Sequence, residues 1–195
     1  MSSLSAEERD RTAWEELFQD AGRVLGTSQP AARHLLVGLV REPAIGAAFL
    51  FRLSSRFHRR GWPFLSTLAT RLNLAFHGCQ IHCRARIGPG LLLPHPCGVV
   101  VGSGVEVGSE ATLFQNVTLG TRSFLGGDYP RLGNQVMVFP NSVVIGSVRL
   151  GDGCRVGAGS VVLHDVPEGV TVAGAPASPL GRSAGQTLSE FSRGQ

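Results

Sequence analysis

Residues 132–166 read LGNQVMVFPNSVVIGSVRLGDGCRVGAGSVVLHDV, and a branched aliphatic residue opens each successive block of six. Four positions after each aliphatic stands a small or short side chain. A period of six matches neither the 3.6-residue repeat of a helix nor the alternation of an ordinary strand. It is typical of a hexapeptide β-helix, in which each repeat is one short strand plus a tight turn and three repeats close a triangular coil. The aliphatic positions are Leu132, Val138, Val144, Leu150, Val156 and Val162, and the short positions are Val136, Ser142, Val148, Cys154, Ser160 and Val166.

The same spacing recurs upstream and is interrupted at two places. Between Leu93 and Val101 the frame slips by two residues, and between Leu119 and Leu132 an insertion rich in glycine and polar residues fills positions 120–131. Breaks in a solenoid are where binding loops occur. The two breaks fall on neighbouring coils of three repeats, so we expect them to mark one site. The upstream repeat positions are Ile81, Ile87, Leu93, Val101, Val107, Leu113 and Leu119, with Val105, Ala111 and Val117 as short residues.

The segment before the repeats has helical rather than six-residue periodicity. Ser5 and Glu8 form a capping box ahead of an amphipathic stretch that runs to about Leu25. Pro43 and Pro63 suit the first turns of later helices. We expect those helices over residues 31–41, 43–61 and 63–76. Their apolar residues Ala48, Phe51, Phe57, Phe64, Leu68 and Leu72 should be buried against each other or the first coils.

These patterns predict the fold class and the domains. The protein should be mainly β, with a parallel β-helix of hexapeptide repeats after an N-terminal α-helical region. The helical region is placed at 1–76, the β-helix domain at 77–178 and a C-terminal tail at 179–195. The insertion at 120–131 should form a loop thrown out from a coil.

The composition argues against several classes of protein. The chain has 195 residues and a net charge of +4, and all its basic residues are arginine. Because the arginines are scattered, apart from a group at 52–60, we expect no nucleic-acid binding. Arg41, Glu42 and Pro43 break the most apolar segment, so no membrane span is expected. No secretory signal is visible, which favours a cytoplasmic protein whose four cysteines stay reduced.

The histidines and cysteines near position 80 suggest a zinc site. The repeat frame argues against it, because Cys79, Cys97 and Cys154 fall at short-residue positions where a free cysteine is a compact apolar side chain. The chain also has no Cys-x-x-Cys pair. A metal-dependent β-helix enzyme of the carbonic-anhydrase kind needs a third histidine at coil spacing after His77 and His95, and that position is a leucine. We therefore predict no metal.

His95 is the strongest candidate for chemistry among the histidines. It stands between Pro94 and Pro96 where the frame slips, so its side chain should be exposed. Histidine side chains exchange protons near neutral pH and are the commonest general bases. Position alone leaves open a surface histidine without a role. His82, two residues from Gln80 on the preceding coil, is a second candidate.

The repeats and both interruptions resemble the serine acetyltransferases. The resemblance rests on residues 85–102, 115–120, 126–128, 156–162, 166–167 and 174–177, including the Pro-His-Pro turn at 94–96 and the Gly-Gly-Asp at 126–128. It covers about 100 residues in one register. The Pro-His-Pro element and the chain length look like the short branch of this family found beside polysaccharide and specialised-metabolite genes. The resemblance implies a left-handed coil, an acetyl-CoA-dependent O-acetyltransferase and a homotrimer with acetyl-CoA between neighbouring prisms.

The resemblance also implies roles for individual residues. His95 is the implied general base for the acceptor hydroxyl, and Gln80 stands where the family has an aspartate that orients the imidazole. Asp128 and Tyr129 are the implied lining of the acceptor pocket, and Tyr129 replaces an Arg-His pair of the family. Arg131 or Arg122 is left to substitute for the arginine that holds the serine carboxylate. The residues expected to contact acetyl-CoA are Thr121, Phe139, Pro140, Gly157, Ala158 and Gly159.

Sequence reasoning leaves the acceptor open. It is L-serine, a sugar hydroxyl or the hydroxyl of a specialised metabolite. A further alternative is an inactive hexapeptide scaffold that binds a partner protein, because the orienting aspartate and the second histidine of the family are missing. The family's tail docks into a sulfhydrylase and typically ends in Ile, whereas this chain ends in Gln195, which argues against that partner.

Overall fold

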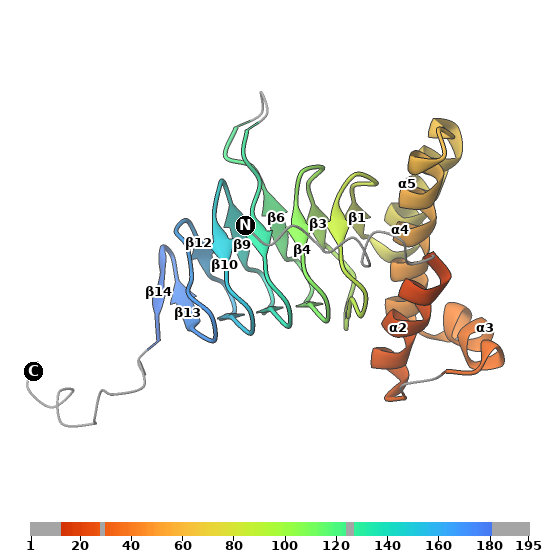
Figure 1. Cartoon of the computed structure of the whole chain (residues 1–195), viewed down its shortest axis with the longest axis horizontal. Coiled ribbons are helices and arrows are strands. Elements are labelled where there is room, and N and C mark those ends of the chain that lie inside the picture. Colours follow the sequence, from red (N-terminus) through yellow and green to blue (C-terminus); the bar gives the residue numbers. More distant parts are fainter. Residues whose placement is uncertain (1–12, 28–29, 124–126, 181–195) are drawn as a thin grey trace, which may run out of the picture.

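Two parts make up the described chain, a group of helices and a triangular prism of short strands (Figure 1). The structure is a computed structural model that describes residues 13–27, 30–123 and 127–180. The helices stand across one end of the prism, and the last strands lie at the opposite end (Figure 1). The strands follow one another around the prism in successive coils.

The described helices are α2 (Ala13–Leu25), α3 (Ala32–Arg41), α4 (Pro43–Arg59) and α5 (Pro63–His77). Proline occupies the first turn of α4 and of α5, where its missing N–H costs no hydrogen bond. α5 ends at Gly78, whose φ of 61° lies in the left-handed region that glycine adopts without strain. These bounds are close to the predicted ones. The Ser5–Glu8 capping box lies outside the described residues.

The strands form three sheets, which are the three faces of the prism. The first face holds β1 (Gln80–Ile81), β3 (Val100–Val101), β6 (Thr118–Gly120), β9 (Val143–Ile145) and β12 (Val161–Val162). The second face holds β2 (Arg86–Ile87), β4 (Glu106–Val107), β7 (Arg131–Leu132) and β10 (Arg149–Leu150). The third face holds β5 (Thr112–Leu113), β8 (Met137–Val138), β11 (Arg155–Val156), β13 (Thr171–Gly174) and β14 (Ala177–Pro179). The pairing is parallel except between β13 and β14.

Strand register gives the length of each coil. On the first face Gln80 pairs with Val100, Val100 with Thr118, Thr118 with Val143, and Val143 with Val161. The steps are 20, 18, 25 and 18 residues. The frame slip therefore adds two residues to one coil, and the insertion adds seven to another. Both interruptions are confirmed at their predicted positions.

The two interruptions nevertheless leave the prism at different edges. We name the edge between the third and first faces the His95 edge; it consists of residues 94–99, 114–117, 139–142 and 157–160. The loop edge, between the first and second faces, consists of the described residues 82–85, 102–105, 121–123, 127–130, 146–148 and 163–165. The slip follows the last strand of a coil and the insertion follows the first strand of a later one. For that reason the single site expected from their spacing does not form within one chain.

Aliphatic side chains fill the inside of the prism. The repeat aliphatics from Leu132 to Val162 are at most 5% exposed, which confirms the predicted frame. Cys79 and Cys154 are buried at short-residue positions, as expected. Cys97 is exposed, and this prediction was wrong. The two extra residues of the slip come before Val99, so Val99 takes the buried position instead.

The outward side of α5 corrects a second expectation. Phe64, Leu68 and Leu72 are 77%, 45% and 37% exposed, although their spacing predicted burial. α5 packs against α4 with its small and polar side. Asn73 on that side is buried, and its Nδ2 donates a hydrogen bond to the Ala47 carbonyl at 3.0 Å. An exposed apolar stripe therefore runs along α5.

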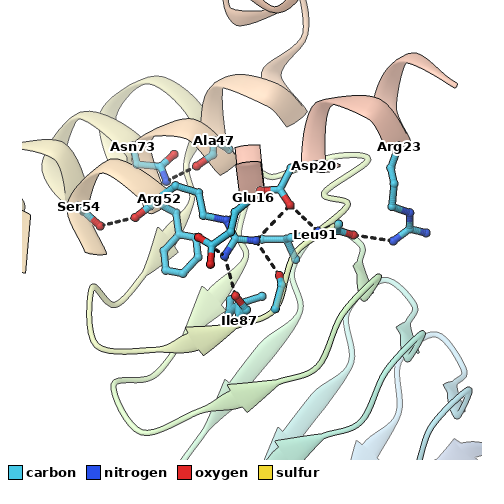
Figure 2. A network of polar contacts seen from close by, with 12 residues as sticks. Glu16, Asp20, Arg23, Ala47, Arg52, Ser54, Asn73, Ile87 and Leu91 are labelled. Atoms are coloured by element: carbon cyan, nitrogen blue, oxygen red, sulfur yellow. Dashed lines mark hydrogen bonds and ion pairs between the residues drawn. The ribbon is translucent and has the colours of Figure 1, made fainter. Parts of the chain in front are cut away.

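A buried ion pair joins the helices to the first coil (Figure 2). Arg52 of α4 donates two hydrogen bonds to the carboxylate of Asp20 in α2, at 2.9 and 3.1 Å. The same guanidinium donates to the carbonyls of Ile87 and Gly88 at 2.6 and 2.7 Å. Asp20 also accepts the N–H of Leu91 at 2.7 Å. Burial alone would lower the pKa of Arg52, but the charges of Asp20 and Glu16 and the hydrogen bonds to Asp20 together outweigh it, so the pKa is raised.

The described residues contain neither a lone membrane-crossing helix nor a metal-binding cluster. None of the described helices is long and apolar enough to span a bilayer by itself, and α3 and α4 reach that length only as a pair bent by 104°. No three His, Cys, Asp or Glu side chains of the described chain are grouped so as to hold a metal ion.

Candidate active site

The turn that carries His95 presents an exposed imidazole on a constrained backbone. Pro94 and Pro96 fix their own φ angles, and Pro96 is buried while His95 is exposed. The N–H of Val99 closes the turn on the Pro96 carbonyl at 3.2 Å. Gln80 lies at the start of the first face beside this turn, because its backbone N–H donates to the Val99 carbonyl at 2.8 Å. Its side chain is exposed on the outward side of β1.

The rest of the His95 edge is a regular stack of tight turns. One residue per coil has a left-handed φ between 57° and 72°, and its N–H donates to a carbonyl of the preceding coil. The side-chain amide of Asn116 also donates to Asn141 Oδ1 at 2.9 Å. The rings of Phe114 and Phe139 stack with centroids 5.1 Å apart and 8° between their planes. The left-handed residues are Gly98, Asn116, Asn141 and Gly159.

Most of the residues predicted to contact acetyl-CoA lie on this edge, on the coils beyond His95. Ala158 and Gly159 are exposed, and the absence of large side chains leaves the backbone of their turn open to a ligand. Thr121 lies instead on the loop edge, where its hydroxyl oxygen accepts the N–H of Ser123 at 3.2 Å. The five that share the edge with His95 are Phe139, Pro140, Gly157, Ala158 and Gly159.

Tyr129 fastens the returning limb of the insertion to the loop edge. Its ring lies across Gly102 and Gly104, so close that a Cβ on Gly102 would stand 2.5 Å from the ring and one on Gly104 would overlap it. Its hydroxyl oxygen accepts a hydrogen bond from Ser103 Oγ at 3.2 Å. Asp128 beside it is exposed. Tyr129 therefore sits on the coil that the His95 turn opens, one edge away from His95.

The two arginines considered for the acceptor carboxylate are already engaged. Arg122 donates to the Leu163 carbonyl at 2.6 Å and lies over Gly146, which holds the outgoing limb of the insertion against later coils. Arg131 points outward from the second face, where its Nε lies 3.8 Å from a carboxylate oxygen of Glu106. Neither lies on the His95 edge.

His82 also lies on the loop edge rather than with His95. Burial lowers the pKa of His82, and the positive charges of Arg84 and His58 lower it further. Its Nδ1 accepts the N–H of Arg84 at 3.1 Å, which leaves Nε2 to carry the proton of the neutral ring. His82 is therefore held neutral as part of a turn.

Comparison with known proteins identifies the family. A model of the bacterial transferase hexapeptide (six repeats) matches residues 129–164. The serine acetyltransferase of Helicobacter pylori is 40% identical over 166 residues, which cover 85% of this chain and 96% of that protein. The chain belongs to the serine acetyltransferase family. It is an acetyl-CoA-dependent O-acetyltransferase.

Solved structures of the family share the fold. The serine acetyltransferase of Neisseria gonorrhoeae superposes with a TM-score of 0.79 at 29% identity and covers 94% of this chain and 72% of its own. The same enzyme in complex with serine gives a TM-score of 0.78 at 30% identity, over 88% of this chain and 70% of its own. The left-handed β-helix predicted for a serine acetyltransferase is confirmed by these structures.

Gly102 and Gly104 form the surface on which the Tyr129 ring packs, which we call the glycine seat of Tyr129. The sequence of this serine acetyltransferase family member did not predict that contact. Glycine is common at such corners of the repeat, so only the contact with Tyr129 distinguishes Gly102 and Gly104.

Gly104→Ala should displace the Tyr129 ring and lower kcat/KM roughly 10- to 100-fold, because misplaced site residues cost that much. Steady-state kinetics will measure it. Gly120→Ala is the matched control, since a Cβ there meets nothing within 4 Å. Equal activities for the two variants would contradict the role of Tyr129.

Proposed function

We propose that the protein is a serine O-acetyltransferase that moves the acetyl group of acetyl-CoA to the hydroxyl of L-serine, with His95 as general base. The observation that supports this most is the exposed His95 on a constrained turn, on the same edge as five residues predicted to contact acetyl-CoA. Relatives named serine acetyltransferase at up to 40% identity support serine as the acceptor.

The chemistry assigned to His95 is a proton relay. An imidazole nitrogen takes the proton of the serine hydroxyl while that oxygen attacks the thioester carbonyl. The carbon–sulfur bond then breaks, the imidazolium returns the proton to the departing sulfur, and O-acetylserine and CoA are released. Gln80 orients the imidazole from the neighbouring strand. A neutral amide can hold one tautomer of the ring, although it stabilises the cation less than a carboxylate does.

The first face supports the proposed homotrimer. Its outward side chains are uncharged, whereas the second face presents charged residues. Three prisms that turn their first faces towards a common axis bring the His95 edge of each copy against the loop edge of the next. Asp128 and Tyr129 of one copy then face His95 of its neighbour at the same coil, and acetyl-CoA lies in the groove between them. The outward residues of the first face are Gln80, Val100, Thr118, Val143 and Val161.

The assembly can be tested on two matched positions. Light scattering should give roughly 62 kDa, three times the chain mass of 20.6 kDa. Val143→Arg on the first face should shift the mass to that of a monomer and abolish activity. Met137→Arg, also half-buried and outward but on the third face, should leave the trimer intact. A wild-type monomer at micromolar concentration would overturn the shared site.

The acceptor is tested by measuring thiol release from acetyl-CoA with L-serine, L-homoserine and a panel of sugars, and by mass spectrometry of the product. We expect L-serine to give the highest kcat/KM and O-acetylserine as product. Higher kcat/KM with a sugar would assign the protein to hydroxyl acceptors without an amino-acid group. Absence of thiol release with every acceptor tested would favour the inactive scaffold.

A further inference from the structure

An L-serine acceptor carries a carboxylate, and the described insertion leaves no cation free for it. Arg122 is bonded to the Leu163 carbonyl, and Arg131 stands beside Glu106 on another face. A carboxylate brought into a groove between subunits is costly unless a cation meets it. The site proposed above therefore needs a cation from another segment of the loop edge.

Arg84 occupies the loop edge directly next to Tyr129. The pairing of Arg86 with Glu106 sets Arg84 opposite Gly104, and the Tyr129 ring lies where a Cβ of Gly104 would be. Adjacent coils are about 4.8 Å apart, so the side chain of Arg84 is long enough to reach the surface around that ring. Arg84 is exposed. Its guanidinium has no hydrogen bond or ion pair within the part of the chain that the structure describes.

The backbone of Arg84 is fixed although its side chain is free. The N–H of Ala85 donates to the His82 carbonyl at 2.9 Å, and the N–H of Arg84 donates to His82 Nδ1 at 3.1 Å. A guanidinium on a fixed turn is well suited to a carboxylate, because its fork of N–H groups matches the two oxygens.

The charge around Arg84 favours an anionic ligand. The sequence from Pro43 to Val105 contains no aspartate or glutamate. Glu106, on the neighbouring face, is already contacted by Arg86 and Arg131. The exposed carboxylate of Asp128 comes from the adjoining limb of the insertion and offers a partner for an ammonium group.

We propose that Arg84 binds the carboxylate of the acceptor and so selects amino-acid acceptors over simple alcohols. This inference rests on the serine acetyltransferase function proposed above. The acceptor is held at three points: its carboxylate by Arg84, its ammonium by Asp128 of the same copy, and its hydroxyl by His95 of the neighbouring copy. Arg84 thereby binds the carboxylate that Arg122 and Arg131, which already make other contacts, do not bind.

The test compares two acceptors that differ by one carboxylate. L-serine and ethanolamine share the hydroxyl and the amine, and kcat and KM are measured for both at saturating acetyl-CoA. Arg84→Ala should raise the KM for L-serine roughly 10- to 100-fold with kcat little changed, because a charge-assisted contact is lost. The constants for ethanolamine should stay as in the wild type. Arg84→Lys should fall between, since it keeps the charge and loses the fork.

Arg86→Ala is the matched control, two residues away but paired with Glu106 on the second face. It should leave the ratio of kcat/KM for L-serine to kcat/KM for ethanolamine unchanged. An unchanged KM for L-serine in Arg84→Ala would overturn the proposal, and so would an equal loss with both acceptors, which would indicate a structural role. A wild-type enzyme inactive with L-serine would overturn the proposed function itself, and this inference with it, before any variant is made.

Discussion

His95→Ala should lower kcat at least ~100-fold, because a positioned general base contributes about 10² to 10⁴ to the rate. The affinity for acetyl-CoA should be nearly unchanged, since the residues expected to bind it lie on later coils of the same edge and His95 itself is an exposed side chain. Thiol release gives kcat, and calorimetry with CoA gives the affinity.

The matched control is His82→Ala, which alters a histidine on the loop edge. It should retain kcat at saturating L-serine, because His82 takes no part in the proton relay; its Nδ1 accepts the N–H of Arg84, so its loss should act on the KM for L-serine instead. If His95→Ala kept near-wild-type turnover while His82→Ala lost it, the base would lie on the loop edge.

Arg52→Met should destabilise the protein by about 3–5 kcal/mol, because breaking a buried ion pair leaves an uncompensated charge. Arg52 is 4% exposed and Asp20 is 1% exposed, so solvent does not replace the lost partner. The free energy of unfolding is obtained from urea titrations at one fixed protein concentration, since the stability of the proposed trimer depends on concentration.

Two further variants separate the ion pair from simple packing. Arg59→Met, an exposed position at the end of α4, should change stability by less than about 0.5 kcal/mol. The double variant Arg52→Met with Asp20→Leu should cost less than the sum of the two single changes, because neither Arg52 nor Asp20 is left buried as an unpaired charge. Full additivity would show that the pair does not act as a unit.

The repeat frame could be predicted from the sequence because the same physical demand recurs every six residues. Val138 and Val156 both point into the prism and are fully buried, and that burial requires an aliphatic side chain. The same six-residue period therefore predicts both positions. The place of the frame slip followed from the same count. Its consequence for Cys97 was misjudged, because a two-residue slip has two possible positions within a turn and the sequence alone does not choose between them.

The sequence could not predict which separate segments of the chain come into contact. The spacing of Phe64 and Leu68 shows that α5 has an apolar side, but not which neighbour that side meets. The seat of Tyr129 on Gly102 and Gly104 joins residues about 25 positions apart across an insertion, which no period records. Arg84 carries no motif at all, and only its place opposite Gly104 draws attention to it.

The separation of His95 and Tyr129 onto different edges has a genetic consequence. If each active centre takes its base from one copy and its acceptor pocket from the next, two defective chains can repair each other when mixed. A His95→Ala chain still supplies a sound loop edge, and a Gly104→Ala chain still supplies a sound His95. In a mixed trimer that contains both kinds of chain, about one active centre in three combines an intact His95 with an intact loop edge. Co-expression of the two defective alleles should therefore give more activity than either allele gives alone.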